Sequence, residues 1–165
     1  MMSGSGTWYF IQWAHFLALS LWIGGITSLA GIAAPAAHAS MASRAVAGEI
    51  VGKILKKLNT VELLACTVLL ATSLASFRFV RARENWLGGM MMILIVMGLL
   101  TLYYGFHLSP RLESIKERMP TLDSLSSNHA AKIEFDRLHR IYVKLMSLNL
   151  VLALGVLYLS VVIFK

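Results

Sequence analysis

Charged residues are scarce in this sequence. Asp, Glu, Lys and Arg make up 14% of its 165 residues, against about 25% in a typical soluble domain. The first 43 residues contain none of the four, and hydrophobic residues reach 58%. This composition excludes a disordered chain, a coiled coil and an ordinary soluble enzyme. The length allows one domain only, and we expect that domain to lie in a membrane.

Cysteine and catalytic motifs are almost absent as well. The single cysteine, Cys66, lies in an apolar run, so no internal disulfide can form and the thiol should behave as a small hydrophobic group. The patterns G-x-S-x-G and H-E-x-x-H and the phosphate-binding glycine loops do not occur. We therefore predict no catalytic site, and our leading interpretation is a non-catalytic protein.

The remaining charge is mostly positive. Lys and Arg number 15 and Asp and Glu 8, which gives a net charge of +7. These basic residues flank apolar segments, where they suit lipid headgroups, and no nucleic-acid-binding signature accompanies them. The lipid bilayer is the predicted partner, and nucleic acid is not expected.

Four long stretches are uncharged and continuously apolar. A helix needs about 20 apolar residues to cross a hydrocarbon core about 30 Å thick, and lipid offers no partner to free backbone groups. We predict an all-α integral membrane four-helix bundle, with spans at about residues 8–34, 60–80, 86–108 and 141–164.

The ends of two of these helices can be predicted more closely. Pro35 should stop the first helix, because proline lacks the N–H that continues a helix. No Gly or Pro interrupts residues 128–154, so the last helix should begin near Asn128. At about 1.5 Å per residue it would be about 50 Å long or more and would protrude from the bilayer.

Residues 47–58 have an apolar stripe opposite charged residues. The basic members of the charged face are Lys53, Lys56 and Lys57. This pattern is typical of a short amphipathic helix that lies in the membrane interface. The alternative, equally compatible with the pattern, is that the stripe packs on the bundle or on a partner.

An even number of spans places both termini on one side of the membrane. The connections at residues 35–59 and 109–140, with the adjoining helix ends, carry eleven Lys and Arg, and the other side carries four. The positive-inside rule therefore places these two connections in the cytoplasm. We expect the chain in a bacterial inner (plasma) membrane.

Small residues recur every four positions on the first predicted helix, at Ser20, Gly24 and Ser28, with Gly25 beside them. Such spacing lets two helix backbones approach closely. Packing within the chain is the favoured interpretation. The alternative is a seam between two copies of the chain.

A few side chains could carry chemistry. His15 lies within the first span, where an imidazole is costly unless it faces the bundle. His107, His139 and Glu62 all lie near the same predicted membrane surface and are chemically able to hold a metal ion. They show no short ligand spacing, so a salt-bridged helix end is the favoured interpretation of this group.

Several short segments follow one another in a recognisable order along most of the chain. They are His15 with Leu19–Gly25, Ala34 and Pro35, Ala47–Gly52, Ser109–Arg111 and Phe135–Arg140. In these segments the chain resembles the transmembrane protein 205-like family, four-helix membrane proteins whose bacterial members carry a domain of unknown function. This resemblance implies a fold and a location.

A fainter resemblance is confined to the first helix. His15, Trp22 and the glycines that follow look like the first span of the CopD copper-transport and HemJ porphyrinogen-oxidase families. In the latter, the resemblance implies haem b bound through the histidine and a lysine on another span. Two functional hypotheses result: an accessory subunit of a larger membrane complex or, alternatively, a haem- or copper-handling membrane protein that uses His15 and Trp22.

Overall fold

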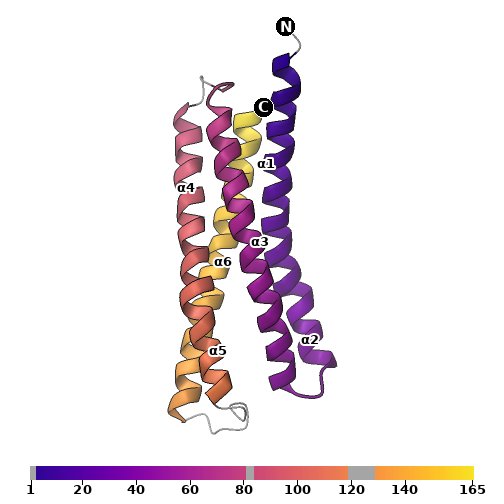
Figure 1. The fold of residues 1–165 in the computed structure, drawn as a ribbon, viewed down its shortest axis with the longest axis vertical. Helices are drawn as coiled ribbons and strands as arrows, with labels where there is room; N and C mark the ends of the chain where they lie inside the picture. Colours follow the sequence, from indigo (N-terminus) through magenta and orange to yellow (C-terminus); the bar gives the residue numbers. More distant parts are fainter. Residues whose placement is uncertain (1–2, 81–83, 119–128) are drawn as a thin grey trace.

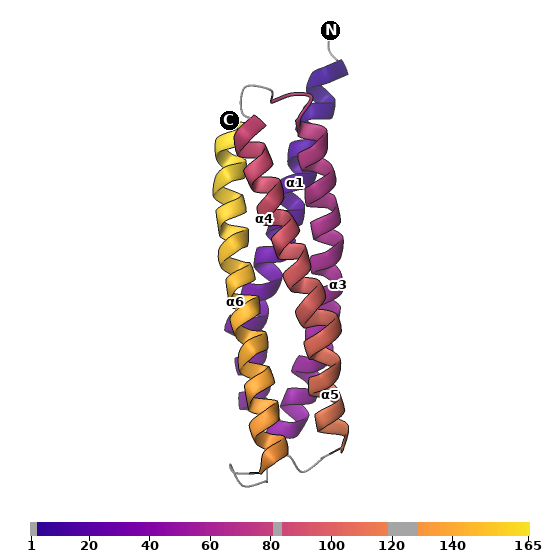
Figure 2. The same ribbon diagram turned by 90° about the vertical axis from the view of Figure 1, so that its left-hand side faces the viewer.

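The apolar stretches of the sequence become four long helical rods that run side by side (Figures 1 and 2). The computed structural model describes residues 3–80, 84–118 and 129–165, and it contains no strand in these ranges. The prediction of an all-α four-helix bundle is therefore confirmed. The elements are α1 (Ser3–Ser28), the π-helical η1 (Leu29–Ala33), α2 (Ala34–Ser40), α3 (Arg44–Ser76), α4 (Glu84–Tyr103), the π-helical η3 (Tyr104–Leu108), α5 (Ser109–Arg118) and α6 (Ala130–Phe164).

Each rod is long and apolar enough to cross a membrane. The four candidate spans in the described residues are Gly6–Ser40, Arg44–Ser76, Glu84–Arg118 and Ala130–Phe164. Both termini lie at the same end of the bundle (Figure 1), as four crossings require. α6 has 35 residues, which corresponds to about 52 Å at about 1.5 Å per residue. The predicted long last helix is thus confirmed.

Two of the rods pass through a proline without ending. The prediction that Pro35 stops the first helix is wrong, since α2 continues to Ser40. The physical reason is the π-helical turn η1, in which the N–H of Ala34 donates to the carbonyl of Leu29. The same arrangement precedes Pro110, where the Ser109 N–H donates to the Tyr104 carbonyl. A wider turn leaves room for the proline ring and does not need its missing N–H.

The segment at residues 47–58 is not a separate helix in the membrane interface, and that prediction is corrected here. It forms the first turns of α3, which begins after Ser43, whose Oγ accepts from the Val46 N–H at 3.3 Å. Ala47 and Leu58 are buried, and Val51 and Leu55 pack against the core. The apolar stripe is covered by the bundle itself, which was the alternative interpretation.

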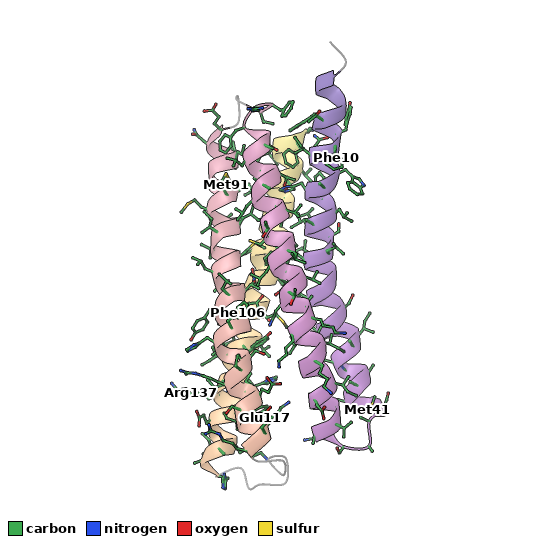
Figure 3. The ribbon with its side chains drawn as sticks, in the orientation of Figure 1. Phe10, Met41, Met91, Phe106, Glu117 and Arg137 are labelled. Carbon is green, nitrogen blue, oxygen red and sulfur yellow. The ribbon has the colours of Figure 1, made fainter. Side chains whose placement is uncertain are left out.

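One end of the bundle is charged. It comprises α2, the first turns of α3, α5 and the first turns of α6, and we call it the charged end (Figure 1). Figure 3 shows Glu117 and Arg137 near this end, and Phe10 and Met91 toward the other. Lys116 Nζ donates to the Gly48 carbonyl at 3.2 Å and so joins α5 to α3. Residues 119–128 of the predicted 109–140 connection lie outside the described residues.

Small residues hold α4 close to α3 inside the bundle. A Cβ at Gly98 would lie 3.0 Å from Cys66 Sγ, and one at Gly105 would lie 3.2 Å from Asn59 Nδ2. These short spacings show that the two backbones approach as closely as side chains allow. In lipid, such packing and interhelical hydrogen bonds stabilise a bundle, because lipid tails are as apolar as the helices themselves.

Candidate functional site

Buried polar side chains gather in two layers between the helices. The His15 layer consists of His15 on α1, Thr72 on α3 and Ser160 on α6. The Glu62 layer consists of Glu62 on α3, Thr101 on α4, Tyr104 at the start of η3 and Asn149 on α6. Ten residues of α3 separate Glu62 from Thr72, which is about 15 Å along the helix.

The His15 layer ties three helices together. His15 is fully buried, and its Nδ1 lies 2.9 Å from Thr72 Oγ1 while its Nε2 lies 2.9 Å from Ser160 Oγ. Both hydroxyls also reach carbonyls of their own helices, Thr72 to Val68 at 2.8 Å and Ser160 to Val156 at 2.7 Å. The prediction that His15 faces the bundle is confirmed.

The Glu62 layer is centred on the Tyr104 hydroxyl. This hydroxyl donates to Glu62 Oε2 at 2.7 Å and accepts from Asn149 Nδ2 at 3.0 Å. Thr101 Oγ1 lies 3.0 Å from the same hydroxyl and accepts from Asn149 Nδ2 at 2.9 Å. All four of these residues are fully buried. The layer therefore connects α3, α4 and α6 in a site closed to solvent.

Three buried polar atoms at or near this layer have no hydrogen-bond partner. They are Glu62 Oε1, Asn149 Oδ1 and Trp22 Nε1. In the His15 layer one neighbour, Ser73, also has an unbonded hydroxyl. A hydroxyl can rotate toward a carbonyl of its own helix, but a carboxylate oxygen and an amide oxygen cannot donate to one. The unmet hydrogen bonds therefore concentrate around Glu62.

The packing of α1 against α3 places Trp22 at the level of Glu62. His15 meets Thr72, and a Cβ at Gly25 would run into the side chain of Leu58. The two helices are antiparallel, so interpolation between these contacts sets Trp22 opposite the turn that carries Glu62. Trp22 is fully buried at this level of the bundle, and its indole N–H has no hydrogen-bond partner.

A second polar contact lies one turn closer to the charged end. The Tyr142 hydroxyl donates to Asn59 Oδ1 at 3.1 Å, and the Tyr142 and Tyr104 rings lie 5.2 Å apart. Asn59 comes three residues before Glu62 on α3. The buried polar groups therefore continue from the Glu62 layer toward the charged end.

The residues predicted as metal ligands are not brought together. His107 is exposed and stacks on Tyr103 at 5.3 Å, and His139 is exposed and stacks on Phe135 at 6.0 Å. Glu62 points into the bundle toward Tyr104 instead. No group of three His, Cys, Asp or Glu side chains capable of holding a metal occurs in the parts of the chain that the structure covers.

The residues proposed for a cofactor are both inside the bundle. Both ring nitrogens of His15 already contact hydroxyls, so coordination of haem or copper would require one of these contacts to break. Trp22 is buried about two turns further along α1. This arrangement fits a structural histidine better than an axial ligand.

The predicted small-residue positions on α1 divide between two faces. Gly25 faces α3 and Leu58. Ser20 and Ser28 are exposed, and a Cβ at Gly24 would meet nothing within 4 Å. The stripe formed by Ser20, Gly24 and Ser28, which we call the outer α1 stripe, therefore points away from the bundle.

The three lysines predicted at the membrane interface are exposed on the first turns of α3. Lys53 pairs with Glu49 at 2.6 Å, one helical turn away. Lys56 pairs with Glu113 on α5, with Nζ 2.6 Å from Oε1. These positions keep the charges at the charged end, where they can reach headgroups or water.

Sequence reasoning did not identify Thr101, Tyr104, Thr72 or Ser160 as partners in these layers. A signal was present, because Thr101 and Tyr104 stand three apart in an otherwise apolar span and so share a helix face. Asn149 is likewise a polar residue in an apolar span, and it makes interhelical hydrogen bonds to Thr101 and Tyr104. Which helix supplies each partner depends on register, which the sequence pattern does not contain.

The fold and the buried layers define a four-span, all-α integral membrane protein. The profile of a family described as a domain of unknown function (DUF4149) matches residues 17–121, more than half of the chain, and the chain belongs to this family. The match includes Trp22, Glu62 and Tyr104 but neither His15 nor Asn149. It does not confirm the more specific resemblance to transmembrane protein 205-like proteins. No curated protein and no solved structure matches the chain.

Proposed function

We propose that this protein is a non-catalytic subunit of a larger membrane complex, and that the outer α1 stripe receives a transmembrane helix of another subunit. The observation that carries the proposal is that Ser20, Gly24 and Ser28 face outward, with free space beside Gly24. Two helix backbones can approach closely where small residues lie between them. A lipid tail finds fewer atoms to contact on such a surface than on a face of large side chains.

The position of α1 in the bundle supports this proposal. α1 packs on α3 and α6, and Figure 1 shows no other helix of the bundle beyond its outer side. The large side chains that flank the stripe, Leu17 and Leu21, are 43% and 52% exposed. A partner helix would therefore lie on the small residues, beside the row that these two leucines form along one side of the stripe.

The orientation in the membrane is part of the same proposal. We infer that the charged end is cytoplasmic and that the membrane is the bacterial inner membrane. The support is the excess of Lys and Arg on the residues of that end. The C-terminus at Lys165 lies at the opposite end of the bundle (Figure 1). A reporter enzyme that works only outside the cytoplasm should therefore be active when fused to it, and one that works only in the cytoplasm should be inactive.

The test is a helix-face substitution in the native membrane. A tagged full-length chain carrying Gly24→Leu should lose its cross-linked or co-purifying membrane partner, because leucine fills the surface on which the partner helix lies. The matched control is Gly155→Leu on α6, since Gly155 is exposed and, like Gly24, has nothing within 4 Å of its Cβ position. This control should retain the partner.

Two results would refute the proposal. One is a wild-type chain that purifies from the native membrane in mild detergent as a monomer with no stoichiometric partner. The other is an assembly that survives Gly24→Leu and Gly155→Leu equally well. The measurement is native gel electrophoresis of the detergent-solubilised membranes, before and after cross-linking.

A further inference from the structure

The Glu62 carboxyl group lies inside the bundle with only half of its hydrogen bonds made. It is fully buried, Oε2 accepts from the Tyr104 hydroxyl at 2.7 Å, and Oε1 has no partner. Neither of the ion pairs seen between described residues includes it; these join Lys53 to Glu49 and Lys56 to Glu113. An ionised carboxylate at this position would be an uncompensated charge in an apolar environment, which is costly.

The hydrogen bonds around Glu62 have a fixed direction. Asn149 Nδ2 lies 3.3 Å from the Met97 carbonyl, which can only accept, so this end of the amide is the donor. Nδ2 then donates to Tyr104, and Tyr104 donates to Glu62. Asn149 Oδ1 is consequently the acceptor left over, and it belongs to the same network as the free Glu62 Oε1.

We propose that Glu62 is a proton-binding site, with the proton on Oε1 and hydrogen-bonded to Asn149 Oδ1 either directly or through one water molecule. One O–H bond then removes the charge and supplies the donor that Asn149 Oδ1 lacks. The hydrogen bonds close into a ring from Glu62 through Asn149 and Tyr104 back to Glu62. The proton comes from water at the charged end of the bundle.

The surrounding groups favour a proton over a metal cation. The free oxygens at the layer number two, Glu62 Oε1 and Asn149 Oδ1, among the described side chains, whereas a hard metal ion takes about six oxygen ligands. The described side chains therefore supply too few free ligands for such an ion. A single buried water molecule can donate to both oxygens, and buried waters typically bridge unbonded polar groups in this way.

The charged end is the nearer source of protons for this site. The titratable groups that face Glu62 are Tyr104 from η3 and Tyr142 from α6, and α1 presents Trp22. The nearest basic residues, Lys57 on α3 and Lys144 on α6, are exposed and lie about two turns or less toward that end. In the opposite direction, about 15 Å of apolar side chains separates Glu62 from His15. These buried side chains include Leu69, Leu94 and Val156.

Infrared spectroscopy tests the proposal on the full-length protein in phosphatidylcholine vesicles. The C=O stretching band of a protonated carboxylic acid should be present at neutral pH, where exposed carboxylates are ionised. The band should move to lower frequency in D2O and should be lost in Glu62→Gln. The matched control is Glu113→Gln, an exposed carboxylate paired with Lys56, which should keep the band.

If Glu62→Gln does not fold, the Tyr104→Phe variant and a pH step applied to one side of the membrane still test the proposal. Tyr104→Phe removes the hydrogen bond to Oε2 and should shift the band without abolishing it. In vesicles of uniform orientation, a pH step on the side of the charged end should change the band, and a step on the other side should not.

Three outcomes would overturn the proposal. The first is the absence of the band in the wild-type protein at neutral pH. The second is its persistence in a folded Glu62→Gln variant. The third is its removal by Na⁺ or K⁺ at constant pH, which would make a metal cation the occupant of the site.

Discussion

The two polar layers belong to one bundle and lie about 15 Å apart. They differ in how completely the titratable side chain of each layer, His15 or Glu62, is hydrogen-bonded. Around His15, both ring nitrogens contact hydroxyls that also reach carbonyls of their own helices. In the Glu62 layer, one carboxylate oxygen and one amide oxygen remain unbonded. The three bonded side chains of the His15 layer satisfy one another, although the neighbouring Ser73 hydroxyl has no partner, whereas the side chains of the Glu62 layer do not.

The difference comes from the chemistry of the partners. Ser and Thr hydroxyls donate to the carbonyl four residues earlier whenever nothing else is available, so a hydroxyl layer satisfies itself. The Glu62 layer uses a carboxylate and an amide, which cannot reach their own helix in this way. In a membrane interior, a layer of hydroxyls and imidazole therefore serves as a structural link, and an incomplete carboxylate layer indicates a missing proton or water.

The backbone repeats this contrast. Tyr104, the centre of the Glu62 layer, opens the π-helical turn η3, whereas the His15 layer is built on regular α-helix. π-helical turns are found frequently at functional sites, because the wider turn changes which side chains face inward. Here the turn also carries Gly105, which lets Asn59 approach. The less regular backbone thus accompanies the less complete hydrogen bonding.

The largest effect is expected when the centre of the Glu62 layer is removed. Tyr104→Phe deletes the hydroxyl that contacts Glu62, Asn149 and Thr101. Glu62 Oε2 would then be buried without a partner, so we expect a loss of about 2 kcal/mol in the free energy of unfolding. The measurement is unfolding by SDS in mixed micelles, followed by circular dichroism.

Tyr142→Phe is the matched control for this prediction. It removes the same atom from a neighbouring tyrosine whose hydroxyl contacts Asn59, and the expected loss is about 0.6 kcal/mol, the average for a membrane hydrogen bond. Equal losses for the two variants would show that the Glu62 layer is no more than ordinary interhelical contact.

The His15 layer should lose less. His15→Leu keeps a side chain of similar size and removes the contacts to Thr72 and Ser160, but both hydroxyls keep the carbonyls of their own helices. We expect a loss of about 1 kcal/mol in the same SDS assay. A loss of unfolding free energy larger than that of Tyr104→Phe would show that the His15 layer, not the Glu62 layer, contributes more to the stability of the bundle.

The four helices of the bundle could be predicted from the sequence because lipid, not water, is the solvent. Lipid requires every backbone group to be bonded within the chain, so uncharged runs specify helices and the four spans could be predicted. The continuation beyond Pro35 could not, because the hydrogen bonds rearrange into η1, and residue types alone do not show a π-helical turn. The amphipathic stripe at residues 47–58 shows that one face is covered, but not by what.

The site divides in the same way. That His15 faces inward follows from the cost of an imidazole in lipid, and it needs no knowledge of the neighbours. The partners of Glu62 depend on the register of α3 against η3 and α6, which the packing of Gly98 and Gly105 sets. No short sequence spacing encodes that register, so Glu62 could be singled out as a candidate while Tyr104 as its partner could not.

The smallest effect is expected at the charged end, outside both layers. Lys56→Gln breaks the pair with Glu113, in which the side chains are 53% and 47% exposed. Water screens an ion pair of this exposure, so we expect a loss of about 0.5 kcal/mol or less, falling further as salt is added. The SDS assay at low and high NaCl measures it. A loss that is independent of salt and as large as that of Tyr104→Phe would place the stability of the bundle in its charged end, and the distinction between the two buried layers would then no longer explain what holds the helices together.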